Sequence, residues 1–313
     1  MSNVTTTNQI ANALEEWYNP NLIDLSQPLL IADQFGIKAT IPSKSSPSVK
    51  WGSFNDLADP AGPISEGIEP DGQLLQITRM TATCQQYGDL VILSDVVELT
   101  VSDPVANQAG IKLGQQMAKY LDTLTFDVLN ASGSLYNMQY GDNGNVPSQV
   151  TQEDCDAIVS ALMSNDSPTF TKIASGTNKF GTEPLDESYY VLAHTNIYND
   201  LKKLSSWVPI SKYPAPEVRK NGERGYTDNA RWCLSSKAPV STDATPIYPC
   251  FFLGMDAYGV VDINGGNAEM IFTPAGGPGD RLKQRSSLGW KAWHAAKILQ
   301  EKNMVRARAT LSA

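Results

Sequence analysis

Two stretches of alternating apolar and polar residues near the start of the chain predict a long β-hairpin. The first is VKWGSF, residues 49–54, and the second is LLQITRMTATCQQYGDLVIL, residues 74–93. The segment between them is crowded with glycine and proline and carries the acidic residues Glu66, Glu69 and Asp71. An isolated two-stranded ribbon is marginally stable in water and leaves both faces open. We therefore expect an arm with an acidic tip that lies on a partner surface.

The next stretch has the period of an amphipathic helix. Asp103 followed by Pro104 gives an N-cap and a proline at the first helical position. Apolar residues then recur at intervals of three or four, at Val105, Ala109, Leu113, Met117, Leu121, Leu124 and Val128. The pattern predicts a helix over residues 103–131 with one apolar face, longer than most helices of globular proteins.

Shorter elements are predicted in the middle of the chain. Thr151, with Asp154 three residues later, indicates the start of a second helix. Its inward-facing residues are expected to be Ile158, Val159, Leu162 and Met163. The apolar run YYVLAH, residues 189–194, predicts a buried strand, and TNIYNDLKKL, residues 195–204, predicts a short capped helix.

The stretch after this helix has two textures. Residues 205–247 contain five prolines and are expected to be rich in loops. The apolar segment YPCFFLGMDAYGVVDI, residues 248–263, predicts strands that are broken at Gly254 and Gly259.

SSLGWKAWHAAKIL, residues 286–299, fits two periods. A helix would place Trp290, Trp293 and His294 on one face, whereas a strand would place Trp293 opposite the other two. The flanking segments DRLKQRSS and MVRARA both alternate, and Gly289 would interrupt a helix. We therefore predict one long strand here and a shorter strand at residues 304–309.

Composition narrows the class of protein. A length of 313 residues allows two domains or one large core with an appendage. The net charge of −9 repels nucleic acid over long range, and the charged fraction of 18% leaves room for extensive subunit contacts. The four cysteines, Cys84, Cys155, Cys233 and Cys250, lie far apart without a CxxC pair. This spacing argues against a zinc site or a disulfide framework and favours a reducing compartment.

Residues 1–47 mix polar stretches with short apolar clusters separated by prolines, and they read as an N-terminal arm. The first ten residues, MSNVTTTNQI, lack the basic and apolar regions of a signal peptide. No apolar run of about 18 residues occurs along the chain. We expect a protein that is made in the cytosol and has no membrane partner.

Residues that could carry chemistry are few. His194 and His294 lie near no nucleophile signature, so both are interpreted as structural. No phosphate-binding glycine motif occurs, and DNGN at residues 142–145 lacks the glutamate that completes a calcium loop. Asp122 and Asp127 do not share a helical face and are interpreted as a solvated or interface edge. The sequence indicates no catalytic residue, cofactor or metal site.

Two oppositely charged groups of residues lie on extended elements. The groups are Glu66, Glu69 and Asp71 at the arm tip, and Arg281, Lys283 and Arg285 at alternate positions before and within the long C-terminal strand. One hypothesis is that the two groups meet between subunits. The alternative is two unrelated solvated charge runs, because exposed ion pairs contribute only about 0–1 kcal/mol each.

Six phrases are spread through nearly the whole chain. They are ISEGIEPDG (64–72), QYGDLVILSDVVEL (86–99), DPV (103–105), LDTLTFDVLN (121–130), GMDAYGV (254–260) and GWKAWHAAKIL (289–299). In these phrases and their order the chain resembles the major capsid proteins of tailed bacteriophages, in the subfamily named after the coat protein of phage N4. No single phrase is as specific as a zinc motif, and the resemblance rests on all six together.

The resemblance implies an α+β fold, the HK97-like phage capsid fold, with an extended E-loop hairpin and a long spine helix. The implied parts are an N-terminal arm at 1–47, an E-loop at 48–90, a peripheral domain at 91–150 with the spine helix at 103–131, an axial domain at 151–265, and the segment 266–313. This last segment supplies the long strand of the peripheral domain and a C-terminal strand that can return to the axial domain. Trp290, Trp293 and His294 are then packing residues.

The resemblance also implies a structural role without enzymatic activity. Copies of the chain would form hexamers and pentamers that close into an icosahedral shell around double-stranded phage DNA, which is held non-specifically. The implied location is the virion capsid, after assembly in the host cytoplasm. The implied partners are a separate scaffolding protein, a portal at one vertex and, as an open option, a decoration protein, with no cofactor.

Two further inferences concern alternatives. No lysine occurs between Lys50 and Lys112, so the arm tip lacks the amine that some relatives use to join subunits covalently, and we expect a non-covalent shell. An encapsulin-like compartment with the same fold is one alternative function. A soluble α+β hydrolase that uses His194 or His294 with an acidic residue is an alternative from another class.

Overall fold

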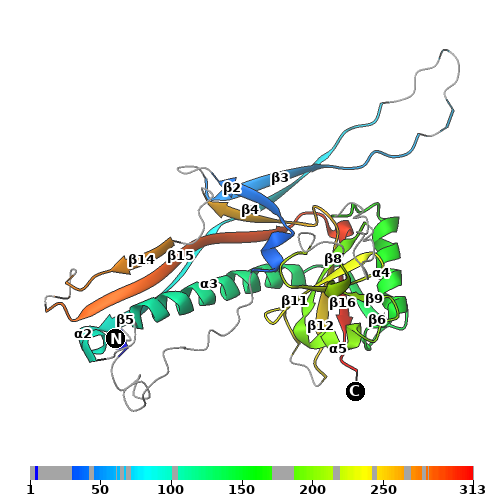
Figure 1. Cartoon of the computed structure of the whole chain (residues 1–313). Helices are drawn as coiled ribbons and strands as arrows, with labels where there is room; N and C mark the ends of the chain where they lie inside the picture. Colours follow the sequence, from blue (N-terminus) through cyan, green and yellow to red (C-terminus); the bar gives the residue numbers. More distant parts are fainter. Residues whose placement is uncertain are drawn as a thin grey trace.

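Two β-sheets of different shape organise the chain, and a thin two-stranded arm projects from between them (Figure 1). The structure is a computed structural model. It describes residues 4–5, 30–41, 46–60, 62–63, 67, 72–100, 105–170, 187–213, 219–241, 245–263, 269–276, 280 and 282–312. No helix in these ranges is long and apolar enough to span a membrane.

The larger sheet has eight strands in the order β7-β6-β16-β12-β8-β11-β10-β9. Their bounds are β6 Leu135–Gln139, β7 Asp142–Asn143, β8 Tyr189–His194, β9 Trp207–Pro209, β10 Glu223–Thr227, β11 Ala230–Ser235, β12 Tyr248–Leu253 and β16 Met304–Ala309. The central strands β8, β11 and β12 are buried almost throughout, and their alternate side chains enter two different cores. Such continuous apolar runs are typical of strands covered on both faces.

Short helices cover one face of this sheet. They are α4 Gln152–Ser164, α5 Tyr198–Leu201 and the single-turn 3-10 helix η3 Thr195–Ile197. Another 3-10 helix, η4 Ile210–Lys212, packs with Tyr213 and Tyr226 in a separate small core. The predicted second helix is confirmed, and the Thr151 hydroxyl caps it by accepting the N–H of Asp154. Ile158 and Leu162 are buried as expected, but Met163 is 46% exposed, so its predicted inward orientation is wrong.

The stretch expected to be rich in loops contains a hairpin of the larger sheet. Strands β10 and β11 pair antiparallel, and β11 also pairs parallel with β8. Asp228 and Asn229 form the tight turn between them, and Asp228 adopts a left-handed conformation with φ 41°. Asp and Asn favour turns because they tolerate a left-handed backbone, and the proline count obscured this turn signal.

The second sheet is long and narrow, with the path β1-β5-β15-β13-β2 and β14 paired beside β15. Its strands are β1 Val4–Thr5, β2 Ile37–Ile41, β5 Gln85–Ser94, β13 Tyr258–Ile263, β14 Glu269–Thr273 and β15 Arg285–Ile298. The predicted long C-terminal strand is confirmed as β15, with Trp290 and His294 on its buried side. Gly254 lies between β12 and β13, whereas Gly259 lies inside β13 and does not break it.

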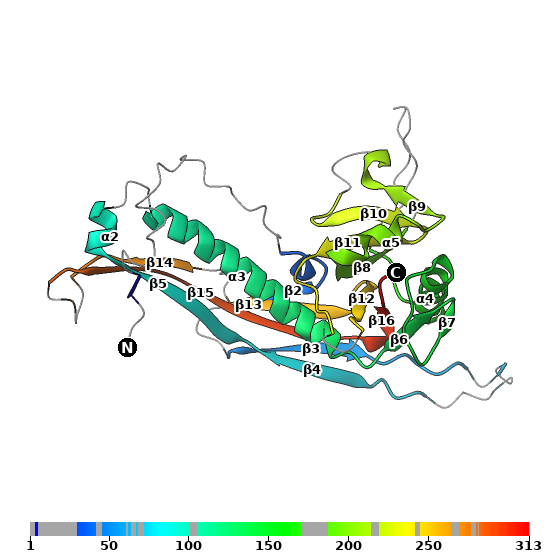
Figure 2. The same ribbon diagram turned by 90° about the horizontal axis from the view of Figure 1, so that it is seen from below.

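Helix α3, Val105–Asn130, runs along one face of this narrow sheet (Figure 2). Its Leu113 and Leu121 pack against Trp290 of β15, which confirms the predicted apolar stripe. Further along the helix, Phe126 and Leu129 enter a core of the larger sheet. The helix therefore joins the two sheets, while its predicted start at residues 103–104 lies outside the described residues. A short helix, α2 at Asp95–Thr100, precedes it.

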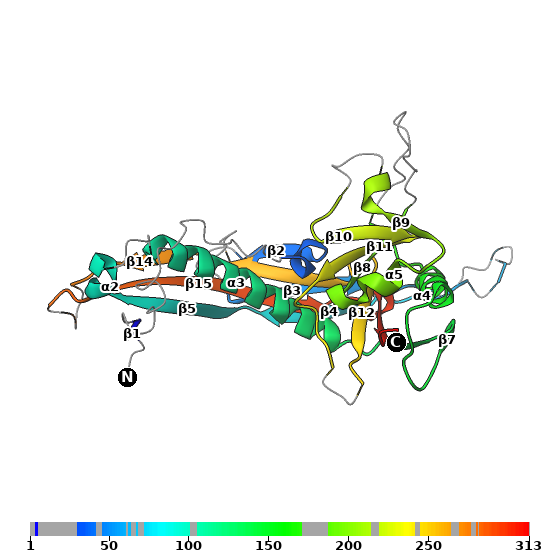
Figure 3. The same cartoon turned by 60° about the horizontal axis from the view of Figure 1, so that its bottom comes forward.

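The arm consists of β3, Ser48–Phe54, and β4, Ile77–Thr83, paired antiparallel. The single strand predicted over residues 74–93 is two strands, β4 and β5, which separate at Cys84. Cys84 is buried, and its N–H donates to the carbonyl of Pro47 at 2.8 Å. Figure 3 shows that the arm passes the eight-stranded sheet and reaches beyond it.

The two sheets do not follow the order of the chain. The larger sheet takes β6 from before the second helix and β16 from the C-terminal end, whereas β13 belongs to the narrow sheet. A 3-10 helix, η6 at Glu301–Asn303, connects β15 to β16 and so links the two sheets. The implied division into peripheral and axial domains stays a prediction.

Candidate assembly surfaces

The arm exposes apolar side chains that a free subunit cannot bury. Phe54 is 61% exposed and Leu74 is 81% exposed, and they are joined by Leu57, Leu75 and Ile77. A hairpin that stays in water would be expected to carry polar side chains at most of these positions. Large apolar side chains left exposed along one element in this way indicate an interaction site.

The base of the arm is fixed by packing on the narrow sheet. Trp51 of β3 lies against Gly259 of β13, where an added Cβ would approach the indole ring to 2.8 Å. Ala82 and Cys84 are buried with Val261 in the same small core, against which Trp51 and Trp293 pack. The base of the arm is therefore held by packing on the narrow sheet, whereas its outer part is exposed to solvent.

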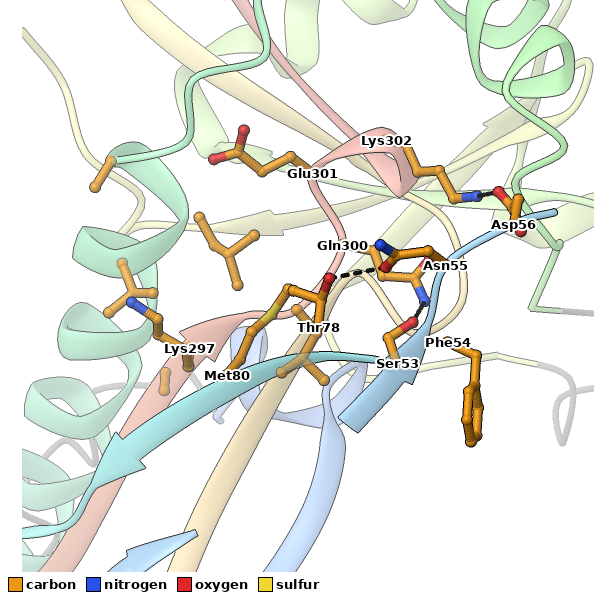
Figure 4. Close-up of a pocket in the computed structure, with 15 residues that line it drawn as sticks. Ser53, Phe54, Asn55, Asp56, Thr78, Met80, Lys297, Gln300, Glu301 and Lys302 are labelled. Atoms are coloured by element: carbon orange, nitrogen blue, oxygen red, sulfur yellow. Dashed lines mark hydrogen bonds and ion pairs between the residues drawn. The ribbon is translucent and has the colours of Figure 1, made fainter. Parts of the chain in front are cut away.

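A cleft of about 1010 Å³ lies between the arm, the end of α3 and the end of β15 (Figure 4). Across it, Lys302 Nζ contacts Asp56 Oδ2 at 2.8 Å, and Gln300 Nε2 donates to Ser53 Oγ at 3.4 Å. Figure 4 shows the ring of Phe54 pointing away from these contacts. Polar contacts thus join the inner side of the arm to η6 and the residue before it, and the Phe54 ring points away from them.

A second open surface lies at the opposite end of the narrow sheet. All five residues of β14 are exposed, including Met270, Ile271 and Phe272. Strand β14 pairs with β15 on one side, and no strand covers its other edge among the described residues. An exposed apolar edge strand is a template for pairing with another chain.

The turn before β15 is held by Asp280. Its carboxylate accepts the N–H groups of Gly276 at 3.2 Å, Gln284 at 2.9 Å and Arg285 at 3.0 Å. These hydrogen bonds hold the pKa of Asp280 below its usual range. Lys283 sits in this turn with φ 55°, so it precedes the strand instead of alternating along it.

Two of the six predicted contact residues can be placed. Lys283 and Arg285 are exposed at this turn. The other four, Glu66, Glu69, Asp71 and Arg281, lie outside the described residues. The described part of the arm and the β14–β15 turn lie at opposite ends of the molecule (Figure 1). Within one chain they are far apart, so a contact between them would need a second copy.

His294 belongs to a buried polar cluster that the sequence analysis missed. Thr125 Oγ1 lies 3.0 Å from His294 Nε2 and 2.5 Å from Asp33 Oδ1, and His294 Nδ1 lies 3.9 Å from Asp33 Oδ2. The hydroxyl has one proton, and the shorter contact assigns it to Asp33, so the imidazole donates to Thr125. Thr125 is 0% exposed, near the C-terminal end of α3. A hydroxyl that donates to a carboxylate and is closed to solvent is not an activated nucleophile.

Asp122 is also buried, which corrects its interpretation as part of a solvated or interface edge. It is 1% exposed and accepts the N–H groups of Ile31 and Ala32 at 2.9 and 2.7 Å. Burial raises the pKa of Asp122 to about 6, against the opposing effect of these two N–H groups. Asp127 is exposed, as the interpretation required.

The remaining candidate groups are structural. His194 ends β8, and its Nδ1 accepts the N–H of Asn196 at 3.1 Å, which caps η3. All four cysteines are buried free thiols. In the part of the chain that the structure describes, no three His, Cys, Asp or Glu side chains gather as metal ligands.

Comparisons with known proteins place this architecture. The capsid of Ralstonia phage GP4 is similar, with a TM-score of 0.71 and 12% identity over 96% of each chain. The cyanophage Pam1 capsid has a TM-score of 0.65 and 12% identity over 96% of each chain. The capsid of cyanophage P-SCSP1u has a TM-score of 0.64 and 14% identity over 97% of this chain and 95% of that one. No protein-family model and no curated protein matches the sequence.

At these identities the likeness shows the fold. The chain has a mixed α+β architecture, the HK97-like fold of phage capsid proteins, which confirms the fold that the sequence resemblance implied. The similarity extends over nearly the full length of both chains, so arm, spine helix and both sheets are included in it.

Proposed function

We propose that the chain is the major capsid protein of a tailed bacteriophage, of the N4-type subfamily. Copies form hexamers and pentamers, which close into an icosahedral shell around double-stranded DNA. One observation carries the proposal. The described chain exposes apolar surface at both ends, on the β3–β4 arm and on β14. The similar solved structures named above, which share its fold, are phage capsids.

The role is structural, and no catalysis is proposed. Among the described residues, the arrangement that resembles a catalytic triad, Thr125 with His294 and Asp33, is closed to solvent and has its hydroxyl proton directed to the carboxylate. This geometry opposes the hydrolase alternative. The similar structures named above are capsids of phages, which favours the phage shell over the encapsulin-like compartment.

The proposed partners follow from the shell. They are further copies of the chain, a separate scaffolding protein during assembly, a portal at one vertex, an optional decoration protein, and packaged DNA without sequence preference. The net charge of −9 suits a container that must not hold DNA tightly. Assembly in the host cytoplasm precedes incorporation in the virion.

Electron microscopy of the purified full-length chain, with light scattering for mass, tests the proposal. Closed shells, or rings of five and six subunits, are the expected result. A chain that stays a monomer at physiological salt, with and without a scaffolding protein from the same source, would contradict it.

Within this function we infer one charged contact between copies. The acidic arm tip, with Glu66, Glu69 and Asp71, would meet the turn that carries Arg281, Lys283 and Arg285 on a neighbour. The positions of Lys283 and Arg285 at the opposite end of the molecule from the arm support a contact between chains. Each pair is worth about 0–1 kcal/mol, so the contact gains its effect by repetition around a shell.

Reversal of the three basic residues to glutamate should reduce shell yield and leave the free subunit folded. Reversal of Arg219, Lys220 and Lys237, which are exposed on the eight-stranded part, changes the net charge equally and serves as the control. Reversal of the three acidic residues to lysine in the same chain should restore assembly. Unchanged assembly of the first variant would remove this contact from the proposal.

A further inference from the structure

Residues 30–35 cross helix α3 and are fastened to it from both sides. Asp122 of α3 accepts the N–H groups of Ile31 and Ala32, which begin the 3-10 helix η2, Ala32–Gln34. No side chain of the segment caps η2 itself, so Asp122 supplies the cap from another element. In return, Asp33 of η2 accepts the hydroxyl of Thr125 of α3 at 2.5 Å.

The segment sits where several elements meet. Ser235 of β11 approaches Asp122 at 3.3 Å, and the Tyr258 hydroxyl of β13 donates to the carbonyl of Ala32. Ile31 and Phe35 are buried, and the ring of Phe35 lies 4.3 Å from that of Tyr190. Strand β2 follows directly and leads the chain toward β3 of the arm. The position of residues 30–35 therefore sets how the arm is tied to α3.

We propose that residues 30–35 form a latch that opens and closes on α3, and that the buried carboxylates Asp122 and Asp33 make its closure depend on pH. Two carboxylates are enclosed in one cluster when the latch is closed, and both gain water when it opens. A closed latch with ionised carboxylates therefore carries an electrostatic cost that opening relieves. The inference concerns a single chain and does not depend on the proposed capsid role.

The charged and titratable groups around the cluster come from five elements besides α3. They are Asp33 of η2, Lys38 of β2, His294 of β15, Tyr258 of β13 and, behind Tyr258, Cys233 of β11. Burial raises the pKa of Asp33, while His294 and Lys38 oppose that rise. The charge of Asp33 adds to the raised pKa of Asp122. Burial raises the pKa of Tyr258 further, so it remains a neutral donor.

The direction of the pH effect follows from Asp122. Its pKa is about 6 in the closed latch and returns toward 3.8 when opening restores its hydration. The closed state therefore binds a proton more readily between these values. Closure is most favoured at the acidic side of this window, and the advantage is lost as pH rises through 6.

Hydrogen–deuterium exchange of the full-length chain tests the latch. Peptides that contain Ile31 and Ala32 report opening, because Asp122 protects these two N–H groups. After correction for intrinsic exchange, their protection should fall about tenfold from about pH 5 to about pH 8. Peptides from α4, which packs in the other core of the larger sheet and shares no cluster with residues 30–35, should not follow this change and serve as the internal reference.

The Asp122→Asn variant separates titration from structure. An asparagine can accept the two N–H groups and donate to Ser235, but it does not titrate. We expect it to keep the protection and lose most of its pH dependence. Asp154→Asn is the matched control, since Asp154 is a buried helix carboxylate that accepts the N–H groups of Gln139 and Gly141 away from the latch.

The wild-type profile decides the question even if Asp122→Asn does not fold. Protection of Ile31 and Ala32 that stays constant, or rises, across this pH range would overturn the latch. An equally steep profile in a folded Asp122→Asn variant would overturn the role of Asp122.

Discussion

The central strands of the eight-stranded sheet and the strands at the ends of the molecule differ in what completes them. In β8, β11 and β12 nearly every residue is buried, by α4 and α5 on one face and by the end of α3 on the other. In β14 every residue is exposed, and β4 is exposed over most of its length. The first region is closed by the chain alone, whereas the second has apolar surface that only another molecule can cover.

The two regions should therefore respond differently to the same substitution. Phe252→Ala in β12 removes a fully buried ring that lies 5.5 Å from Trp232, and it leaves a cavity. We expect a loss of about 3–5 kcal/mol in the free energy of unfolding, measured by chemical denaturation of the free subunit. This is the largest effect predicted here.

Phe54→Ala in the arm removes the same atoms from an exposed site. Because the ring of Phe54 is mostly in water, the free subunit should keep its unfolding free energy within about 0.5 kcal/mol. Shell yield should fall instead. Equal destabilisation by Phe252→Ala and Phe54→Ala would break the comparison between the two regions.

The central sheet also differs from the ends of the molecule in its charged residues, because it contains a buried ion pair. Arg231 Nε donates to Glu223 Oε1 at 2.7 Å with both side chains almost inaccessible. Tyr213 also donates to Glu223, and the Arg231 guanidinium lies 5.1 Å from the Tyr190 ring. The larger sheet thus encloses a charged pair within its own structure, whereas the lysine and arginine at the β14–β15 turn are exposed to solvent.

Arg231→Met should cost about 3 kcal/mol, at the lower end for a broken buried pair, because Tyr213 still binds the abandoned carboxylate. Denaturation with urea would measure it. The double variant Glu223→Leu with Arg231→Met should recover much of the loss, since no unpaired charge then remains. A double variant less stable than Arg231→Met alone would mean that the pair contributes net stability.

The spacing of apolar residues in the sequence predicts the helices and strands that bury one face, such as α3 and β15. The stripe from Leu113 to Leu124 predicted which face of α3 meets the narrow sheet, and the alternation around Trp290 predicted β15. These patterns are local, so one sequence suffices to read them. The acidic arm tip and the basic turn are visible in the sequence as charge groups, but the contact proposed between them would join different copies, and such a contact leaves no pattern in one sequence.

The buried polar cluster had no local signal. Asp122 meets Ile31 across 91 positions, and Thr125 meets His294 across 169. The five-residue spacing from Asp127 predicts a solvated or interface edge, and nothing in that spacing marks Asp122 as covered. It lies instead under residues 30–35, a segment whose path over α3 depends on the tertiary fold. Burial of a polar side chain by a distant segment leaves no period in the sequence.

The smallest effect concerns the ion pair that joins the two regions. Lys302 of η6 contacts Asp56 beyond β3 at 2.8 Å, and both side chains are largely exposed. The hydrogen bond from Lys302 and its charge lower the pKa of Asp56. Lys302→Ala should let that pKa rise toward its ordinary value, as an NMR titration would show, and leave unfolding by urea unchanged.

The matched variant Lys297→Ala removes an exposed lysine from the same cleft, and no ion pair of Lys297 with Asp56 is found among the described residues. It should leave the pKa of Asp56 unchanged. If Lys302→Ala alone lowers the unfolding free energy, the arm is held to the larger sheet by this contact. If it does not, the arm is held by the packing of Trp51 on Gly259 and the small core beneath it, and its outer part is positioned by whatever surface it covers.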